Sequence, residues 1–199
     1  MNHFDFDKQI RAITQESLTA RPFICDGSPF DCTIAQVGIN PGSDTPFWPF
    51  WDSKKFDKRR WMQEYRQRKA GKRTPTRNRI EVLNEALRPY RVIELNLYVE
   101  FSPREAQLKQ QHRDTKLFDF MMDVIEPTLL FVHGREPRCH LERKLGVSLA
   151  PDDFTRTNYR GRGLTVFAAP RHLAFVSGGD DYVSSAGGRI KAYLGAQRA

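Results

Sequence analysis

Residues 33–42 read TIAQVGINPG, a short and nearly continuous apolar run that leads directly into a tight turn. Such a run is typical of a strand covered on both faces in a parallel sheet, whereas a half-exposed antiparallel strand alternates apolar and polar residues. Runs of the same kind recur at residues 92–97, 129–132 and 164–168. The sequence therefore predicts four parallel strands, the first of which ends in the turn.

Helical patterns surround these strands. Between residues 76 and 88 the apolar side chains recur every three or four positions, with Thr76 as the expected N-cap and Pro89 as the stop. We expect helices at residues 7–18, 76–88, 114–125, 135–145 and 184–197. Strands and helices in alternation predict an α/β fold with three layers, α/β/α, around a central four-stranded parallel sheet, whose ligands bind at the carboxyl ends of the strands.

Length and composition favour one globular domain over residues 1–199, of which 39% are hydrophobic and 28% charged. The three cysteines, Cys25, Cys32 and Cys139, form no CxxC pair, which argues against a disulfide framework, a zinc ribbon or a four-thiolate iron–sulfur cluster. The N-terminus contains acids, and no run approaches the roughly 18 apolar residues that cross a bilayer. We expect a cytoplasmic monomer without a membrane partner, metal or cofactor.

Positive charge is concentrated in one insertion, at about residues 52–79. Between residues 54 and 79, five Lys and seven Arg stand against Asp57 and Glu64, a net charge of +10 in a chain whose formal total is +8. A block of one sign inside a folded domain favours a polyanionic partner, of which nucleic acid is the commonest soluble one. An exposed charged helix and loop is the alternative.

Aromatic residues follow the first turn at high density. Phe47, Trp48, Phe50 and Trp51 lie within five residues of a proline-rich loop. Such a loop suits a stacking pocket for a flat ring, and the alternative is a small satellite core beneath the loop.

Polar side chains follow the other strands. Asn96 ends the second strand, and its amide matches the carbonyl and N–H edge of a pyrimidine. His133 follows the third strand and His172 the fourth, and position alone does not rank one histidine above the other.

Together these residues resemble the uracil-DNA glycosylase superfamily. Its first motif has the form G-x-(D/N/E)-P-(G/Y), to which residues 38–42, GINPG, are similar in the variant with Asn. Its second-strand Asn falls on Asn96, and its final motif, H-P-S or a relative, falls on His172, with Leu173 and Ala174 in place of the Pro and Ser. The resemblance implies that His172 rather than His133 acts in catalysis.

The resemblance also implies roles at the base. Asn40 would orient the attacking water, and His172 would donate a hydrogen bond to the departing base. The base would contact Ile39, Asn96 and an aromatic residue of the loop, with Trp51 the first choice and Trp48 and Phe47 beside it. Asp44 and Asp52 are alternatives for activating the water.

DNA contacts are expected at three places. The first turn contributes Gly42 and Ser43, and the histidine turn contributes Arg171. Leu173 and Phe175 are candidates for a side chain that wedges into the duplex, the alternative being that both pack into the core. The phosphate contacts of the basic insertion are expected at Arg59, Arg60 and Arg66.

The implied function is that of a monofunctional DNA glycosylase, which flips out a base and hydrolyses its N-glycosidic bond. Uracil is the expected base. A modified pyrimidine, such as a hypermodified phage base, is the alternative within the same class. A catalytically silent nucleic-acid-binding module of the same fold is the alternative from another class.

Overall fold

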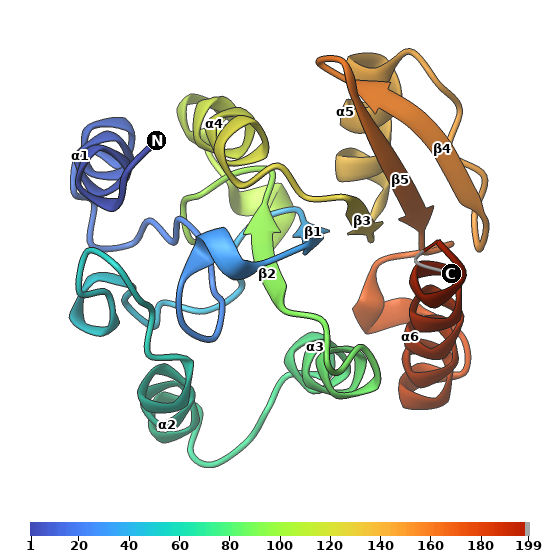
Figure 1. Ribbon diagram of the computed structural model, residues 1–199. Helices are drawn as coiled ribbons and strands as arrows, with labels where there is room; N and C mark the ends of the chain where they lie inside the picture. Colours follow the sequence, from blue (N-terminus) through green and yellow to red (C-terminus); the bar gives the residue numbers. More distant parts are fainter. Residues whose placement is uncertain (198–199) are drawn as a thin grey trace.

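The computed structural model describes residues 1–197 and has a five-stranded sheet in the order β2-β1-β3-β5-β4 (Figure 1). The strands are β1 (Ile34–Gly38), β2 (Val92–Asn96), β3 (Leu129–Val132), β4 (Phe154–Tyr159) and β5 (Arg162–Ala168). Strands β2, β1, β3 and β5 run parallel, and β4 pairs antiparallel with β5. The chain is therefore an α/β protein with a mostly parallel sheet.

Helices cover both faces of this sheet (Figure 1). Residues 1–197 contain α1 (His3–Thr14), α2 (Lys58–Arg68), α3 (Pro75–Ala86), α4 (Lys116–Ile125), α5 (Arg135–Leu145) and α6 (Gly179–Ala196). The helices α3 and α6 pack on one face, and α1, α4 and α5 lie on the other. This arrangement fits the expected three layers.

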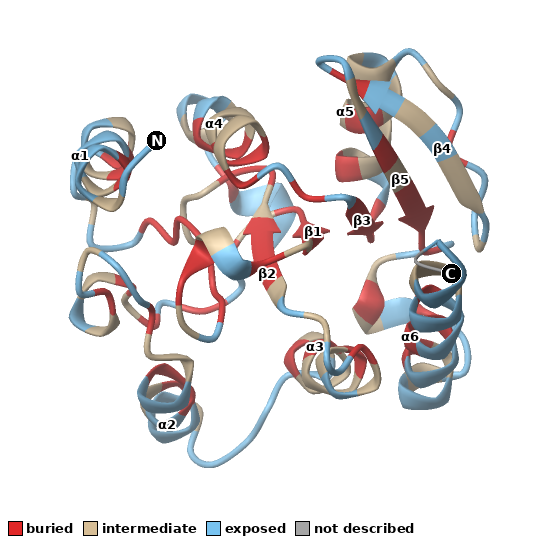
Figure 2. Cartoon of the chain, viewed as in Figure 1, coloured by how far each residue is buried: buried red, intermediate tan, exposed pale blue. Residues whose placement is uncertain are grey.

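The core consists of two apolar clusters, one on each side of the sheet. The four parallel strands are buried along most of their length, while the outer surfaces of the helices are exposed (Figure 2). Ile34 and Phe131 point to the α3 and α6 side, and their neighbours Ala35 and Val132 belong to the other cluster. Because successive side chains of a strand point to opposite faces, nearly continuous apolar runs were needed to fill both clusters.

The predicted count of four strands was wrong, because β4 forms a fifth strand. Residues 154–159 read FTRTNY, and most of these side chains are half-buried or exposed. As an edge strand β4 has only β5 as a neighbour, so it needs no apolar run. The criterion that located the buried strands therefore missed it.

The start of α3 also differs from the expectation. Thr74, not Thr76, is the N-cap, and its Oγ1 accepts a hydrogen bond of 3.2 Å from the backbone N–H of Arg77. Pro75 then occupies the first helical position, where its missing N–H costs no hydrogen bond.

The free edge of β2 is covered by the segment that follows α1. Ile24 pairs antiparallel with Glu94, and Ala20 pairs with Glu100. This pairing shields the backbone groups of the edge strand from other chains. No helix in residues 1–197 has the length and apolar character needed to span a membrane.

Candidate functional site

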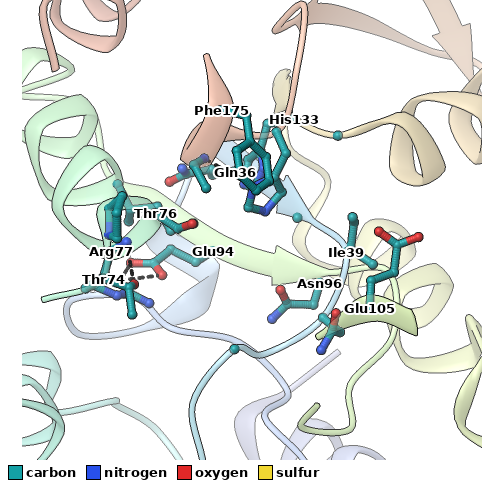
Figure 3. A pocket seen from close by; sticks show the side chains of 18 of the residues that line it. Gln36, Ile39, Thr74, Thr76, Arg77, Glu94, Asn96, Glu105, His133 and Phe175 are labelled. Atoms are coloured by element: carbon teal, nitrogen blue, oxygen red, sulfur yellow. Dashed lines mark hydrogen bonds and ion pairs between the residues drawn. The ribbon is translucent and has the colours of Figure 1, made fainter. Parts of the chain in front are cut away.

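A cavity of about 980 Å³ opens at the carboxyl ends of the parallel strands. Gln36 and Gly38 of β1 lie in register with Glu94 and Asn96 of β2, so these residues share the sheet face that α3 and α6 partly cover. His133 follows β3 on the same face. Figure 3 shows Thr74, Thr76, Arg77 and Glu94 on one side of the cavity and Ile39, Asn96 and Glu105 on the other.

The predicted convergence of three polar residues is present. Asn40, Asn96 and His172 all line this cavity, although they come from the ends of different strands. The physical reason is that parallel strands end at the same edge of a sheet, so residues that follow them are brought together. Ile39, Gly42, Ser43 and Arg171 line the same cavity.

The amide of Asn40 is held in a fixed orientation. Its Nδ2 donates hydrogen bonds of 3.0 Å to the backbone carbonyls of Pro41 and Ser102. Within the described residues its Oδ1 has no hydrogen-bond partner. Since both donors are occupied, Asn40 offers the cavity an acceptor only.

Asn96 and His133 meet at Gly38. A Cβ added to Gly38 would lie 3.2 Å from Nε2 of His133 and 3.3 Å from Oδ1 of Asn96. The glycine therefore lets both side chains approach the backbone of β1. Residues 1–197 provide no hydrogen-bond partner for the Asn96 amide, which leaves it able to bind a ligand.

His172 lies beside His133, with ring centroids 5.0 Å apart in an edge-to-face contact. Nδ1 of His172 accepts a hydrogen bond of 3.1 Å from the backbone N–H of Ala174. In the neutral ring the proton is therefore on Nε2, which becomes the donor. Burial lowers the pKa of His172, so the neutral donor form persists below the pH at which an exposed histidine is protonated.

His133 is more deeply buried than His172. Burial lowers the pKa of His133 well below its ordinary value, and the nearby His172 lowers it further. Its Nδ1 is buried and has no partner among the described residues. Sequence position did not separate the two histidines, and the structure brings both to the cavity.

A buried ion cluster forms one wall of the cavity, and sequence reasoning did not find it. Nη1 of Arg77 lies 2.8 Å from Oε2 of Glu94 and 3.0 Å from Oε1 of Glu81, and Nζ of Lys58 lies 3.1 Å from Oε1 of Glu94. Burial by itself would raise the pKa of Glu94, but Arg77 and Lys58 outweigh it and lower the pKa to about 2. Glu94 is therefore an anion at neutral pH. Two cations of the basic insertion, Lys58 and Arg77, therefore form ion pairs in the interior of the protein.

Arg21 is a further cation at the cavity. It is 8% exposed, and the only hydrogen bond of its side chain within the described residues is a 3.2 Å contact from Nη1 to Oγ of Ser43. Its guanidinium lies 5.4 Å from the ring centroid of Trp61. Burial, with the like charge of Arg77, lowers the pKa of Arg21 to about 9.

Gln36 is a buried amide without a partner. It is 2% exposed, and neither Oε1 nor Nε2 makes a hydrogen bond within residues 1–197. Leaving a buried polar group unpaired costs about 1–3 kcal/mol. A central strand that keeps such a residue facing the cavity suggests that a ligand completes its hydrogen bonds.

Four further arginines line the cavity, three of them exposed and one, Arg138, half-buried. Arg104, Arg135, Arg138 and Arg171 line it, and none of them forms an ion pair within residues 1–197. Of these four, the sequence predicts Arg171 alone. Arg135 follows β3 after His133 and Gly134, so the strand-end rule that pointed to His133 would also have found it.

The two wedge candidates separate. Leu173 is fully buried in the cluster between the sheet, α3 and α6, so its expected role as a wedge is corrected to one in the core. Phe175 is 74% exposed and lines the mouth of the cavity, with its ring centroid 6.0 Å from that of His172. Both lie in the 3-10 helix η5 (Leu173–Phe175), whose single turn directs them oppositely.

The aromatic loop forms a core and does not line the cavity. Phe47 is fully buried against Phe23 and Phe56, at centroid distances of 4.9 and 5.1 Å, and Trp51 donates a 2.6 Å hydrogen bond to Oδ1 of Asp7. Trp48 donates to the carbonyl of Ser17. The stacking role predicted for Phe47, Trp48 and Trp51 is therefore corrected, and the satellite core was the right alternative.

The predicted carboxylates also lie elsewhere. Asp44 and Asp52 are exposed and do not line the cavity. Oδ1 of Asp52 accepts hydrogen bonds from the backbone N–H groups of Lys55 and Lys54, which lower its pKa. Glu105 lines the cavity instead, and burial, helped by the negative charge of Glu136, raises its pKa.

Arg59, Arg60 and Arg66 are exposed on α2 and do not line the cavity. Their predicted contacts would therefore lie outside it. Within residues 1–197 no group of three or more His, Cys, Asp or Glu side chains is arranged to hold a metal ion. No protein-family model matches the chain, and a search of curated proteins also found no match.

Proposed function

We propose that this protein is a monofunctional DNA glycosylase that flips a base into the cavity and hydrolyses its N-glycosidic bond, with uracil as the base. The observation that supports the proposal is the shared cavity of Asn40, Asn96 and His172. It offers an acceptor, an unpartnered amide and a neutral donor at the ligand edge of a parallel sheet.

Glycosidic cleavage needs two kinds of stabilisation, because positive charge develops on the sugar and negative charge on the base. Nε2–H of His172 donates to a carbonyl oxygen of the base as that oxygen becomes anionic. Oδ1 of Asn40 accepts a hydrogen bond from the water that attacks C1′. The C1′–N1 bond breaks, the water oxygen bonds to C1′, and the base departs as the anion that His172 stabilises. The attacking water releases one proton to solvent and the uracil anion takes up one proton at N1, so the products are free uracil and an abasic sugar with a hydroxyl at C1′.

Recognition of the base falls to Asn96. Its amide presents an acceptor and donors to the N3–H and O4 edge of uracil. Because Gly38 brings His133 and Asn96 close together, the buried neutral imidazole adds a wall to this end of the pocket.

The mouth of the cavity supports DNA as the substrate. Four arginines without ion pairs suit phosphate contacts, and the exposed ring of Phe175 suits the gap left by a flipped base. The arginines of α2 extend the positive surface. In this proposal the phosphates that matter most for base flipping contact the mouth.

A modified pyrimidine is the second candidate, and the size of the cavity favours it. About 980 Å³ lies at the upper end of the roughly 300–1,000 Å³ typical of pockets for drug-sized ligands. One pyrimidine ring is smaller than such ligands. A base that carries a substituent would use the space beyond Asn96.

The experiment measures abasic sites in oligonucleotides that contain uracil, mismatched uracil or modified cytosine. For the cleaved base, Asn40→Ala and His172→Ala should each lower the single-turnover rate by roughly 10²–10³, with DNA binding nearly unchanged. The double variant should lose less than the product of the two effects. As controls, Asn158→Ala and His112→Ala alter residues outside the cavity and should keep the wild-type rate.

Each contrary outcome is distinct. Binding of all oligonucleotides without cleavage of any would favour the silent binding module. Unimpaired cleavage by both single variants would remove the proposed mechanism, and Glu105→Gln would be the next variant to test.

A further inference from the structure

The cavity extends past Asn96 to an end lined by Arg21, Ser43, Gln36 and the start of α3. We infer that this far end is an oxyanion subsite, which binds a carboxylate or phosphate group of the molecule held in the cavity. The inference rests on the proposed function only in assigning a pyrimidine to the other end.

Arg21 supplies the main observation. Its neighbour Arg77 is paired with Glu94 and Glu81, but the guanidinium of Arg21 has only the neutral hydroxyl of Ser43 as a hydrogen-bond partner among the described residues. A buried guanidinium has five N–H donors, and a cation taken out of water is costly unless an anion accompanies it. An oxyanion in the cavity would supply the missing partner.

The net charge of this wall is positive. Lys58, Arg77 and Arg21 contribute three cations, whereas Glu81 and Glu94 contribute two carboxylates. The carboxylates form ion pairs with Lys58 and Arg77 but none with Arg21, on which Glu94 acts only through space. The cluster therefore leaves one positive charge for a ligand.

The N-terminus of α3 points its first turn at the same space. Thr74 and Thr76 line the cavity, and the Thr76 hydroxyl makes no hydrogen bond within residues 1–197. Pro75 has no N–H and Thr74 caps the N–H of Arg77, so within residues 1–197 the N–H of Thr76 is the unpartnered donor of the first turn. The N-terminal end of a helix carries a partial positive charge, which favours anions. Helix α3 has 12 residues, long enough for this effect.

Gln36 is the independent observation. It is 2% exposed, lines the cavity, and both of its amide atoms lack partners among the described residues. Figure 3 shows Gln36 between His133 and the Thr76, Arg77 and Glu94 group. Nε2 of Gln36 can therefore donate to a ligand that spans the distance from the base edge to Arg21.

The expected ligand is a pyrimidine with an oxyanion attached. Two sources share this chemistry, a carboxylate substituent on the ring and the phosphate of a nucleotide. Two pairs of probes distinguish them by calorimetry. One pair is 5-carboxyuracil and the neutral 5-hydroxymethyluracil, and the other is uridine 5′-monophosphate and uridine.

The anionic member of one pair should bind about tenfold or more tightly than its neutral partner, since hydrogen bonds to a charged group are the strong ones. Arg21→Gln should abolish that preference. Arg143→Gln, which removes a guanidinium exposed on α5 and outside the cavity, should retain it. Equal binding of both members in both pairs would overturn the inference, as would an unchanged preference in Arg21→Gln.

Stability separates a ligand-binding role from a structural one. A buried cation without an anionic partner adds little to the free energy of unfolding. Arg21→Gln should therefore keep the wild-type unfolding midpoint while losing the anion preference. A large loss of stability with unchanged anion preference would make Arg21 structural.

If Arg21→Gln does not fold, Gln36→Leu takes its place. It removes an unpaired buried amide and should reduce anion binding without loss of stability, and unchanged anion binding would overturn the inference.

Failure of the inference differs from failure of the proposed function. Cleavage of uracil oligonucleotides without any preference for anionic probes would contradict the subsite alone. An anion preference that depends on Arg21, in a protein that cleaves no oligonucleotide, would contradict the glycosylase alone.

Discussion

Gly38 ends β1 at the point where two side chains of the site approach the backbone. A Cβ at this position would lie 3.1 Å from Cε1 of His133 and 3.3 Å from Oδ1 of Asn96, so both would have to move by a few tenths of an ångström. Gly38→Ala should lower single-turnover cleavage by about tenfold, because small displacements of positioning groups are costly in rate. The fold should survive, since Gly38 does not have a positive φ.

Gly163 of β5 provides the matched control. A Cβ there would meet no atom within 4 Å, and Gly163 does not line the cavity. Gly163→Ala should therefore retain the wild-type rate. Equal rates for wild type and Gly38→Ala would show that the close approach of His133 and Asn96 is irrelevant to turnover.

His133 predicts how stability changes with pH. The unfolded chain takes up a proton at His133 near its ordinary pKa of about 6.5, whereas the pKa of the folded state is well below this value. Below pH 6.5 the unfolded state therefore binds more protons. As the pH is lowered, the free energy of unfolding decreases by up to about 1.4 kcal/mol per pH unit for this group. His133→Gln should lessen that fall, as measured by urea unfolding at several pH values.

Glu94 limits the window of this prediction. Its folded-state pKa is about 2 against an ordinary value of 4.5, so its stabilisation is complete above pH 4.5 and is lost as the pH falls towards 2. The contribution of His133 to the pH dependence of unfolding is therefore measured between about pH 4.5 and 6.5. The matched variant His112→Gln should follow the wild-type curve, and a His133→Gln curve parallel to it would refute the prediction.

Among the elements, η5 holds a core residue and an exposed residue of the cavity within one turn. Leu173 is fully buried and its carbonyl accepts a hydrogen bond from Arg79, while Phe175 is exposed at the mouth. Leu173→Ala should destabilise the fold by about 2–5 kcal/mol with activity per folded molecule retained. Phe175→Ala should keep the unfolding midpoint and lose duplex cleavage, while cleavage of single-stranded substrate is spared.

The basic elements differ in their distance from the site. We expect the triple variant Arg104→Gln, Arg135→Gln and Arg171→Gln to reduce the slope of log K against log salt by about 0.9 for each phosphate that it no longer neutralises. The triple variant of Arg59, Arg60 and Arg66 to Gln should reduce the slope as well, but with less effect on cleavage of bound DNA. An unchanged slope in both triple variants would make these arginines merely solvated surface.

At the scale of the whole molecule, the aromatic core around Trp51 joins distant parts of the chain. Its ring lies 6.1 Å from Phe6 of α1 and 5.3 Å from Phe23, which belongs to the segment beside β2. Trp51→Ala should therefore cost about 3–5 kcal/mol of stability, as for other large aromatic deletions in cores. Trp51→Phe should cost less, and both should retain activity per folded molecule in single-turnover assays.

The sequence alone determined the parallel strands and the edge where polar side chains meet. Nearly continuous apolar runs predicted β1, β2, β3 and β5, because a strand buried on both faces is mostly apolar. Asn40, Asn96 and His172 could then be grouped, since the ends of parallel strands share one edge. The edge strand β4 escaped this reasoning because contact with a single neighbour demands no apolar run.

Only the tertiary structure decided what lies inside. Twelve basic residues within positions 54–79 look alike in sequence, yet Lys58 and Arg77 face Glu94, while Arg59 and Arg66 face solvent. The dense aromatic loop became a core for the same reason, since burial depends on packing partners far away in the chain, such as the segment around Phe23. Arg21 and Gln36 reach the cavity only because β1 and the covering segment of β2 flank it. Local pattern records which residues can form an element, and long-range packing determines which of their side chains a ligand can reach.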